Sequence, residues 1–339
     1  MEPIDSKIQI QLNKNLPFVV YSKPNSEEIT GFFQHNDTLF EVHNFTEKGF
    51  VFASFDGAKT YIVPESESEI LHFSLDKKEI AVSENVLSKG GNVAKSDFES
   101  LVAKGIQAIK NDQFQKVVLS RTETVAVANF DMVETFQKLV FLYPTAFVYC
   151  FYHPKIGNWI GATPEQLLKV TENNFETISL AGTQKDTGSS AIFWGEKEKE
   201  EQQFVTDYLV QRLQKVASSV QFTKPYSIKA GSIWHIKTDV SGVLNSDSSL
   251  KKVVQLLHPT PAVCGLPKEI AKDFILENEP YDRSFYTGFL GELNCSFAKE
   301  TISSDLFVNL RCMQIKDSQA HLYMGCGITK DSNPEKEWE

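Results

Sequence analysis

Cysteine is scarce in this sequence, and its arrangement excludes the folds that depend on it. The 339 residues contain five cysteines, an odd number, which are widely spaced and form no C-x-x-C pair. Neither a disulfide framework nor a cysteine-based zinc site is therefore indicated, and a reducing cytosol is the expected compartment. The cysteines are Cys150, Cys264, Cys295, Cys312 and Cys326.

Long apolar runs are also missing. No stretch approaches about 18 uninterrupted apolar residues, the length at which a membrane-spanning helix is expected. The N-terminal sequence MEPIDSKIQIQLNK has no apolar core of a secretory signal peptide. We therefore expect a soluble, cytoplasmic protein without a membrane partner.

An excess of positive charge is the third missing feature. The chain carries 34 lysines and arginines against 44 aspartates and glutamates, so its formal net charge is -10, with both signs mixed along the sequence. Such a chain lacks the basic footprint of a nucleic-acid-binding protein, so we expect no nucleic-acid partner. Its hydrophobic content of 41% is enough for a substantial core, in one large domain or two smaller ones.

The order of the sequence patterns divides the chain into two parts. Residues 1–92 are interpreted as short strands between polar turns, for example at 18–22 and 49–55, which form a β-rich flank packed on the core. A polar, glycine-containing segment at 83–97 marks the boundary. Residues 93–339 are more regular and form the predicted main domain.

The main domain combines helix-like and strand-like patterns. A helix capped by Ser96 or Asp97 repeats apolar residues at helical spacing, and a strand rich in β-branched residues follows at 116–127. Runs of strands joined by turns, with a minority of helices, predict an α+β fold rather than a parallel doubly wound sheet. Further strands are predicted at 145–153, 167–180 with a turn at Asn173-Asn174, 232–244, 286–295, 306–315 and 321–328, and helices at 196–218, 248–257 and 267–276.

Lys116 is an unusual residue at the start of an apolar strand. It shares one face of that strand with Val118 and Ser120. A lysine at a strand end commonly extends its amine to water. The alternative interpretation is a partly desolvated amine that serves as a general base.

Glu165 lies in the segment GATPEQLL. Thr163 as N-cap, Pro164 in the first helical position and Glu165 in the first turn form the pattern of an ordinary helix start. The preceding Trp-Ile-Gly-Ala segment also gives the carboxyl group an apolar setting, in which its pKa rises. The second interpretation is therefore a general acid that stays protonated.

The charged segment 196–213 predicts a helix whose charges mostly face solvent. Glu201 is the exception, because it lies four residues before Val205 and seven before Tyr208, on the stripe that faces the protein. A carboxylate on an inward stripe requires a cation, and Glu198 stands one turn earlier.

A glycine pair stands near the C-terminus. Gly325 and Gly327 flank Cys326 at the end of a predicted strand, and Glu337 follows after a polar turn. By itself, such a pair indicates only a bulge or a tight turn.

Taken together and in order, these segments resemble the chorismate-utilising enzymes, the family of isochorismate, salicylate, anthranilate and aminodeoxychorismate synthases. The resemblance covers residues 95–339. It implies an α+β domain with two stacked antiparallel β-sheets, helices packed outside and an active site in a deep cleft. The motifs that carry it are KVVLSR, GATPEQLL, ISLAGTQ, the acidic helix start ending in Glu201, IWHIKTDVSG, LHPTPAVCGLP, EPYDRSFYTGFLGEL, LFVNLRCMQI and YMGCGIT.

The resemblance implies a role for each candidate residue. Lys116 matches the base that deprotonates water for attack on C2 of chorismate, and Glu165 matches the acid that protonates the departing C4 hydroxyl. Mg²⁺ is the implied cofactor, with Glu201 as its first ligand, Glu198 behind it and Glu337 as an outer ligand. The positions that match the substrate cleft are Gly182, Thr183, His235, Tyr286, Gly325 and Arg311, the last of which matches a residue for the enolpyruvyl carboxylate.

Lys116 also bears on the choice within the family. Members that use ammonia generally lack this lysine, and their K-E-x-A-E-H pattern is altered here by Gln202 in place of the histidine. The resemblance thus implies an isochorismate synthase, an isomerase with chorismate as its small-molecule partner and a monomer as the default state. Salicylate synthases share the lysine and then eliminate pyruvate. That activity and a catalytically silent chorismate-binding protein stay open, as does the pathway served, whether menaquinone, siderophore or salicylate biosynthesis.

The C-terminus departs from the family pattern. The family motif runs E-W-x-E-T and is followed by a lysine, whereas this sequence ends at Glu337-Trp338-Glu339. We expect the natural protein to continue, with a second metal-binding carboxylate and a substrate-binding lysine just beyond this end.

Overall fold

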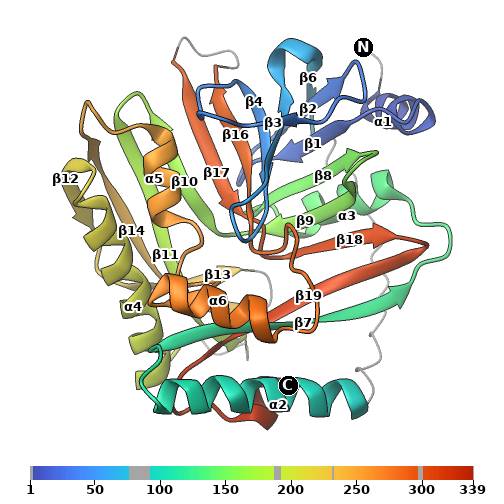
Figure 1. The fold of residues 1–339 in the computed structure, drawn as a ribbon. Coiled ribbons are helices and arrows are strands. Elements are labelled where there is room, and N and C mark those ends of the chain that lie inside the picture. Colours follow the sequence, from blue (N-terminus) through green and yellow to red (C-terminus); the bar gives the residue numbers. More distant parts are fainter. Residues whose placement is uncertain (1–2, 76–91, 187–191, 231–232, 297–300, 339) are drawn as a thin grey trace.

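Two large antiparallel sheets form the body of the protein, with helices on their outer faces (Figure 1). The computed structural model describes residues 3–75, 92–186, 192–230, 233–296 and 301–338. The predicted α+β class and the stacked antiparallel sheets are confirmed. None of the helices in these ranges is long and apolar enough to cross a membrane.

The first sheet, sheet A, has nine strands and contains the strand that begins at Lys116. In spatial order they are β15 (Gly265–Leu266), β7 (Lys116–Ala126), β19 (Gln319–Ile328), β18 (Cys312–Lys316), β9 (Gly157–Thr163), β8 (Phe147–His153), β1 (Phe18–Ser22), β2 (Glu28–Gln34) and β6 (Ser68–Ser74).

The second sheet, sheet B, has ten strands. In spatial order nine of them are β12 (Ala217–Phe222), β14 (Ile233–Leu244), β11 (Asn174–Lys185), β10 (Gln166–Thr171), β17 (Ser303–Val308), β16 (Phe289–Cys295), β4 (Gly49–Ala53), β5 (Thr60–Pro64) and β3 (Phe40–Glu41). The tenth strand, β13 (Tyr226–Ala230), pairs with β14.

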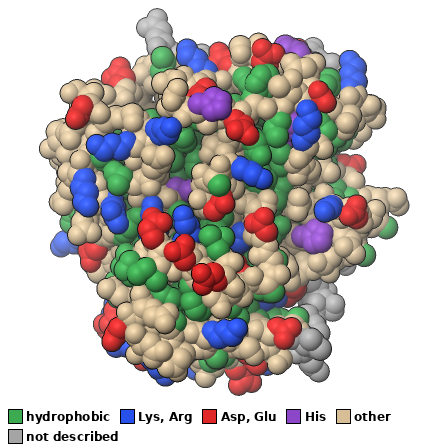
Figure 2. All heavy atoms as spheres, in the orientation of Figure 1, with side chains coloured by type: hydrophobic (Ala, Val, Ile, Leu, Met, Phe, Trp, Pro, Cys, Tyr) green, Lys and Arg blue, Asp and Glu red, His purple; other side chains and the backbone are tan. Residues whose placement is uncertain are grey.

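The helices cover the outer faces and ends of the sheets. Helix α4 packs on β11 and β14, while α2 and the short α7 contact each other below β7 (Figure 1). The helices are α1 (Ile4–Asn13), α2 (Asn92–Lys110), α3 (Met132–Leu142), α4 (Glu196–Leu213), α5 (Leu250–Leu257), α6 (Lys268–Asn278) and α7 (Pro334–Trp338), with a 3₁₀ turn at Glu65–Glu67. On the face shown in Figure 2, acidic and basic side chains are intermixed, as the sequence predicts.

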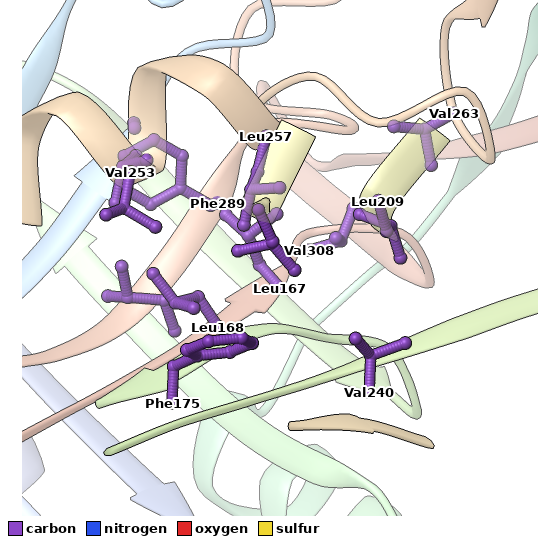
Figure 3. Close-up of a cluster of buried hydrophobic side chains, with 14 of the residues drawn as sticks. Leu167, Leu168, Phe175, Leu209, Val240, Val253, Leu257, Val263, Phe289 and Val308 are labelled. Atoms are coloured by element: carbon purple, nitrogen blue, oxygen red, sulfur yellow. The ribbon is translucent and has the colours of Figure 1, made fainter. Parts of the chain in front are cut away.

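The hydrophobic core has separate parts on the two sides of sheet B. Aromatic rings from both sheets meet between them, where Phe52 of β4 lies 4.5 Å from Phe151 of β8 and Phe147 lies 4.4 Å from Phe307 between ring centroids. On the outer side of sheet B, aliphatic residues of β10 and β14 pack beneath α4 and α5 (Figure 3). Burial of β8 on both faces explains the apolar run at 147–151.

The first 75 residues contribute to both sheets. β1 pairs with β8 and β4 pairs with β16, across more than a hundred residues of sequence in each case. Most of the predicted boundary segment, residues 83–91, lies outside the described residues. The division into a flank at 1–92 and a main domain at 93–339 stays a prediction.

The predicted helix start at Thr163–Glu165 is wrong. Thr163 ends β9, Glu165 lies in the crossing between the sheets, and β10 begins at Gln166. Proline restricts the preceding residue to extended backbone, so Pro164 continues the strand direction at Thr163. The residues that follow pair with β11 and β17, and this pairing outweighs a local capping pattern.

Several other predicted boundaries differ from the structure. Helix α2 begins at Asn92 rather than at Ser96 or Asp97, because its first turn packs beside α7, where Lys95 approaches Glu335 at 3.9 Å. Helix α4 ends at Leu213 rather than 218, because the following residues form β12 on the edge of sheet B. The segment 306–315 forms two strands in different sheets, and the hairpin after β10 turns at Glu172-Asn173. Helices α1 and α3 were not predicted, although Asp131 caps α3 by accepting a hydrogen bond from the Glu134 amide.

Candidate active site

Two crossings between the sheets lie side by side and carry two of the predicted site residues. Glu165 lies between β9 and β10, and Arg311 lies between β17 and β18. The crossings are joined because Thr163 Oγ1 donates to the Val308 carbonyl at 2.7 Å and the Val308 amide donates to the Glu165 carbonyl at 2.9 Å. Both side chains are therefore fixed where the chain leaves one sheet for the other.

Lys116 is completely buried at the start of β7. Its Nζ lies 3.0 Å from Oε1 of Glu201, but the approach does not have hydrogen-bond geometry, and no described group accepts a hydrogen bond from this amine. The interpretation of a strand-end lysine reaching water is therefore wrong. Buried polar groups are almost always hydrogen-bonded in native proteins, so this amine is available to a ligand or to water.

Gly327 explains how Glu201 reaches Lys116. A Cβ atom at position 327 would lie 2.2 Å from Oε1 of Glu201 and 3.2 Å from Cε of Lys116. Any other residue here would displace the carboxylate, so glycine is required by close approach rather than by a bulge. Tyr323, Gly325 and Gly327 lie on one face of β19, but this alternation by itself did not indicate the role of Gly327.

Glu165 is buried, with 3% of its surface exposed. Burial raises the pKa of its carboxyl group to about 7, although the positive charges of Lys116 and Arg311 act to lower it. A substantial fraction of this carboxyl group is therefore protonated at neutral pH, as a general acid requires.

Arg311 and His235 form a connected pair across the site. Arg311 Nη2 lies 2.8 Å from His235 Nε2, and His235 Nδ1 lies 3.0 Å from the Gly182 carbonyl and 3.2 Å from Thr183 Oγ1. A guanidinium only donates, so Nε2 is the acceptor and Nδ1 carries the proton. Burial and, to a smaller extent, the positive charge of Arg311 lower the pKa of His235 to about 4. This histidine is therefore neutral and orients the arginine.

A small cavity of about 360 Å³ opens beside Arg311 and is also lined by Tyr323. Tyr323 stacks between Tyr286 and Trp159, with centroid distances of 4.9 and 5.5 Å. A Cβ atom at position 325 would lie 2.7 Å from the Tyr286 hydroxyl, so Gly325 leaves room for that ring. Tyr323 was not among the predicted site residues, although it opens the YMGCGIT motif.

The three predicted metal ligands lie around the first turns of α4. Glu198 packs against Gly182, whose positive φ of 71° accompanies a register shift between β11 and β14. Glu201 contacts Lys116, and Glu337 of α7 accepts a hydrogen bond from Lys197 at 2.8 Å. Within the described ranges, no three His, Cys, Asp or Glu side chains are close enough to form a ready metal cluster.

The donor set nevertheless fits Mg²⁺. All three groups are carboxylates, the ligands that this hard cation prefers. Lys197 donates to Glu337, and Glu337, Glu201 and Glu198 all act to raise the pKa of its amine. The structure therefore brings together the residues expected from the sequence, while their individual roles stay predictions.

Comparison with known proteins places this geometry in a family. The family described as chorismate binding enzyme matches residues 44–339. The chain belongs to the chorismate-binding enzymes. The match begins within the N-terminal segment, which agrees with the contribution of that segment to both sheets.

Individual relatives of this chorismate-binding enzyme include isochorismate synthases. The chain is 30% identical over 266 residues to the isochorismate synthase EntC of Escherichia coli. This alignment covers 75% of this chain and 66% of EntC, just under two thirds of its length. It is 27% identical over 259 residues to MenF of the same organism, covering 72% of this chain and 57% of that protein.

Solved structures confirm the fold. The putative 2,3-dihydroxybenzoate-specific isochorismate synthase DhbC of Bacillus anthracis superposes with a TM-score of 0.78 at 22% identity and covers 98% of this chain and 95% of that one. Anthranilate synthase component I of Streptococcus pneumoniae superposes with a TM-score of 0.71 at 20% identity and covers 95% and 89%. The fold alone does not separate these activities.

Proposed function

We propose that this chorismate-binding enzyme is an isochorismate synthase, which isomerises chorismate to isochorismate. The observation that carries the proposal is a completely buried lysine, Lys116, electrostatically coupled to a buried glutamic acid, Glu165, whose pKa is about 7. A base and an acid held in one site match a reaction that removes one proton and supplies another. The relatives named as isochorismate synthases support the same assignment.

In the proposed reaction, Lys116 accepts a proton from water as the water oxygen bonds to C2 of chorismate. Both ring double bonds shift by one position, the C4–oxygen bond breaks, and Glu165 gives its proton to the departing hydroxyl, which leaves as water. Arg311, oriented by the neutral His235, would bind the enolpyruvyl carboxylate through its guanidinium.

Mg²⁺, when bound, supplies a positive charge that holds the ring carboxylate of the substrate. Glu198, Glu201 and Glu337 are the residues that would hold it. Gly327 contributes by leaving space for the Glu201 carboxylate.

The test is product analysis. Purified protein incubated with chorismate and Mg²⁺ is expected to give isochorismate, detected by liquid chromatography with mass detection. Lys116→Ala is expected to abolish the product without loss of the fold, whereas Lys104→Ala, on the exposed side of α2, should leave the rate unchanged.

Other products would change the assignment. Salicylate together with pyruvate would indicate a salicylate synthase. Chorismate binding in a calorimeter without any product or Mg²⁺ dependence would indicate a silent chorismate-binding protein. A near-native rate in Lys116→Ala would remove the general-base role.

A further inference from the structure

Lys197 stands at a helix position that usually carries an acidic residue. It is the second residue of α4, and the first turn of a helix carries a partial positive charge that favours acidic residues such as Glu196 and Glu198. A residue that is unfavourable for its local secondary structure is commonly explained by its contacts with residues distant in the sequence. The surroundings of its amine show what that purpose is.

The Lys197 amine faces carboxylates from two elements. It donates to Oε1 of Glu337 on α7 at 2.8 Å, with side chains that are 38% and 13% exposed. Partial burial acts to lower the Lys197 pKa, but Glu337, Glu201 and Glu198 outweigh it and raise the pKa. These are the three carboxylates assigned above to the metal.

Two of these three carboxylates, Glu201 and Glu337, thus each have a lysine partner. Lys116 approaches Glu201 at 3.0 Å, and Lys197 donates to Glu337 at 2.8 Å. Lys116 is enclosed at the start of β7, whereas Lys197 lines a groove of about 1080 Å³ between α2, α4 and α6. Lys197 therefore has space to move away from the carboxylates, and Lys116 does not.

We infer that Lys197 is a built-in counter-ion, which neutralises the carboxylate of Glu337 without metal and competes with a divalent cation for it. The inference rests on the proposed function, because it takes the metal ligands from it. A cation that binds Glu337 meets the ammonium of Lys197, which already donates to Oε1 of that carboxylate. The displaced positive charge then stays nearby and opposes the cation.

A purely structural role predicts the opposite effect. If Lys197 only anchors Glu337 and α7 in position, its removal scatters the ligands and weakens metal binding. If Lys197 competes, its removal lowers the electrostatic cost of binding and strengthens it. The sign of the change in affinity therefore separates the two roles.

The experiment compares Lys197→Met with Lys199→Met in the full chain. Lys199 lies on the same helix and loses the same charge, but it pairs with Glu196 on the exposed side. Mg²⁺ alone is titrated into each metal-free protein by calorimetry, and thermal unfolding is followed with and without Mg²⁺. Lys197→Met is expected to bind Mg²⁺ about fivefold or more tightly than the wild type, and to unfold at a lower temperature without it. Lys199→Met should stay within about twofold of the wild type.

Unchanged or weaker Mg²⁺ binding by Lys197→Met overturns the inference, as does an absence of Mg²⁺ binding by both proteins. Lys197→Arg should retain the wild-type affinity, and Lys197→Gln provides a second test if the methionine variant does not fold. The product assay keeps the proposed function separate. If the wild type makes isochorismate but Lys197→Met binds Mg²⁺ no more tightly, this inference fails and the proposed function stands. If Lys197→Met binds Mg²⁺ more tightly but the wild type makes no isochorismate, the proposed function fails and this inference stands.

Discussion

Lys116 and Glu165 are buried and Arg311 is half-buried, and the environment of all three has a free-energy cost. Removing an amine, a carboxyl group and a guanidinium from water is unfavourable unless each finds a partner. Here the partners are incomplete, since Lys116 has a carboxylate contact without a hydrogen bond. Such residues are more readily explained by ligand binding than by stability, because a well-packed apolar core would be less costly.

Glu165 gives a prediction about pH and stability. Its pKa is about 7 in the folded protein against 4.5 for an ordinary glutamate, so the folded state binds this proton more tightly than the unfolded state. The stabilisation is fully present below pH 4.5 and is lost as pH rises through about 7. It amounts to at most about 3 kcal/mol.

In the variant Glu165→Gln the side chain at position 165 is uncharged at every pH, so its free energy of unfolding should not show this loss as pH rises. Urea unfolding of both proteins between pH 4.5 and 8 should show the free energy of unfolding of the wild type falling relative to the variant by up to about 3 kcal/mol. His235 and His258, whose pKa values are lowered to about 4 by burial, titrate in both proteins and cancel in the difference. Parallel curves would contradict the raised pKa of Glu165.

At the scale of elements, α4 is fixed to sheet B by a buried amide. Gln202 Nε2 lies 2.9 Å from the hydroxyls of Thr206 and Thr238 and 3.3 Å from that of Ser179, on α4, β14 and β11. Glu201 is the neighbouring residue, so this network holds the predicted metal ligand at its place above the sheet. The residue that departs from the histidine of the ammonia-using enzymes is thus a structural connection between three elements.

Gln202→Leu is expected to lower the free energy of unfolding by about 1–3 kcal/mol, because it removes the buried amide that bonds to the Thr206 and Thr238 hydroxyls. The matched control is Gln203→Leu, next to it on the exposed side of α4, where the amide bonds only to Asp207. That control should change stability by no more than about 0.5 kcal/mol. Equal effects of the two substitutions in urea unfolding would refute the role of the Gln202 network.

At the scale of the whole molecule, the two sheets are held face to face by aromatic packing. Phe52 of sheet B lies 4.5 Å from Phe151 and 5.9 Å from Trp159 of sheet A, and 4.4 Å from Phe285. These layers keep a fixed separation, and Glu165 and Arg311 lie where the chain crosses between them. Loss of packing here acts on the whole fold rather than on one residue.

Phe52→Ala should therefore destabilise the protein by about 3–5 kcal/mol, the usual cost of removing a buried aromatic ring. Phe222→Ala, at the edge of sheet B where the ring is 59% exposed, is the control and should cost much less. Urea unfolding measures both. A loss below about 1 kcal/mol for Phe52→Ala would show that this ring does not hold the sheets together.

The sequence by itself determined the features that depend on local period and residue type. Helical spacing placed Val205 and Tyr208 of α4 toward the protein and Glu201 with them, and strand alternation placed Lys116 on one face with Val118. Those patterns report which face of an element is buried, and burial follows directly from apolar content. The resemblance of ordered motifs then indicated the stacked sheets and the residues of the site.

Only the tertiary structure decided the features that depend on distant partners. A local capping pattern predicted a helix at Thr163–Glu165, but pairing of the next strand with β17, more than a hundred residues away, made it a crossing between sheets. The need for glycine at position 327 is visible only once Glu201 of another element lies against it. The pairing of Lys197 with Glu337 joins residues 140 positions apart. Contacts of this kind leave no period in the sequence, because each is fixed by where the sheets and helices come together in space.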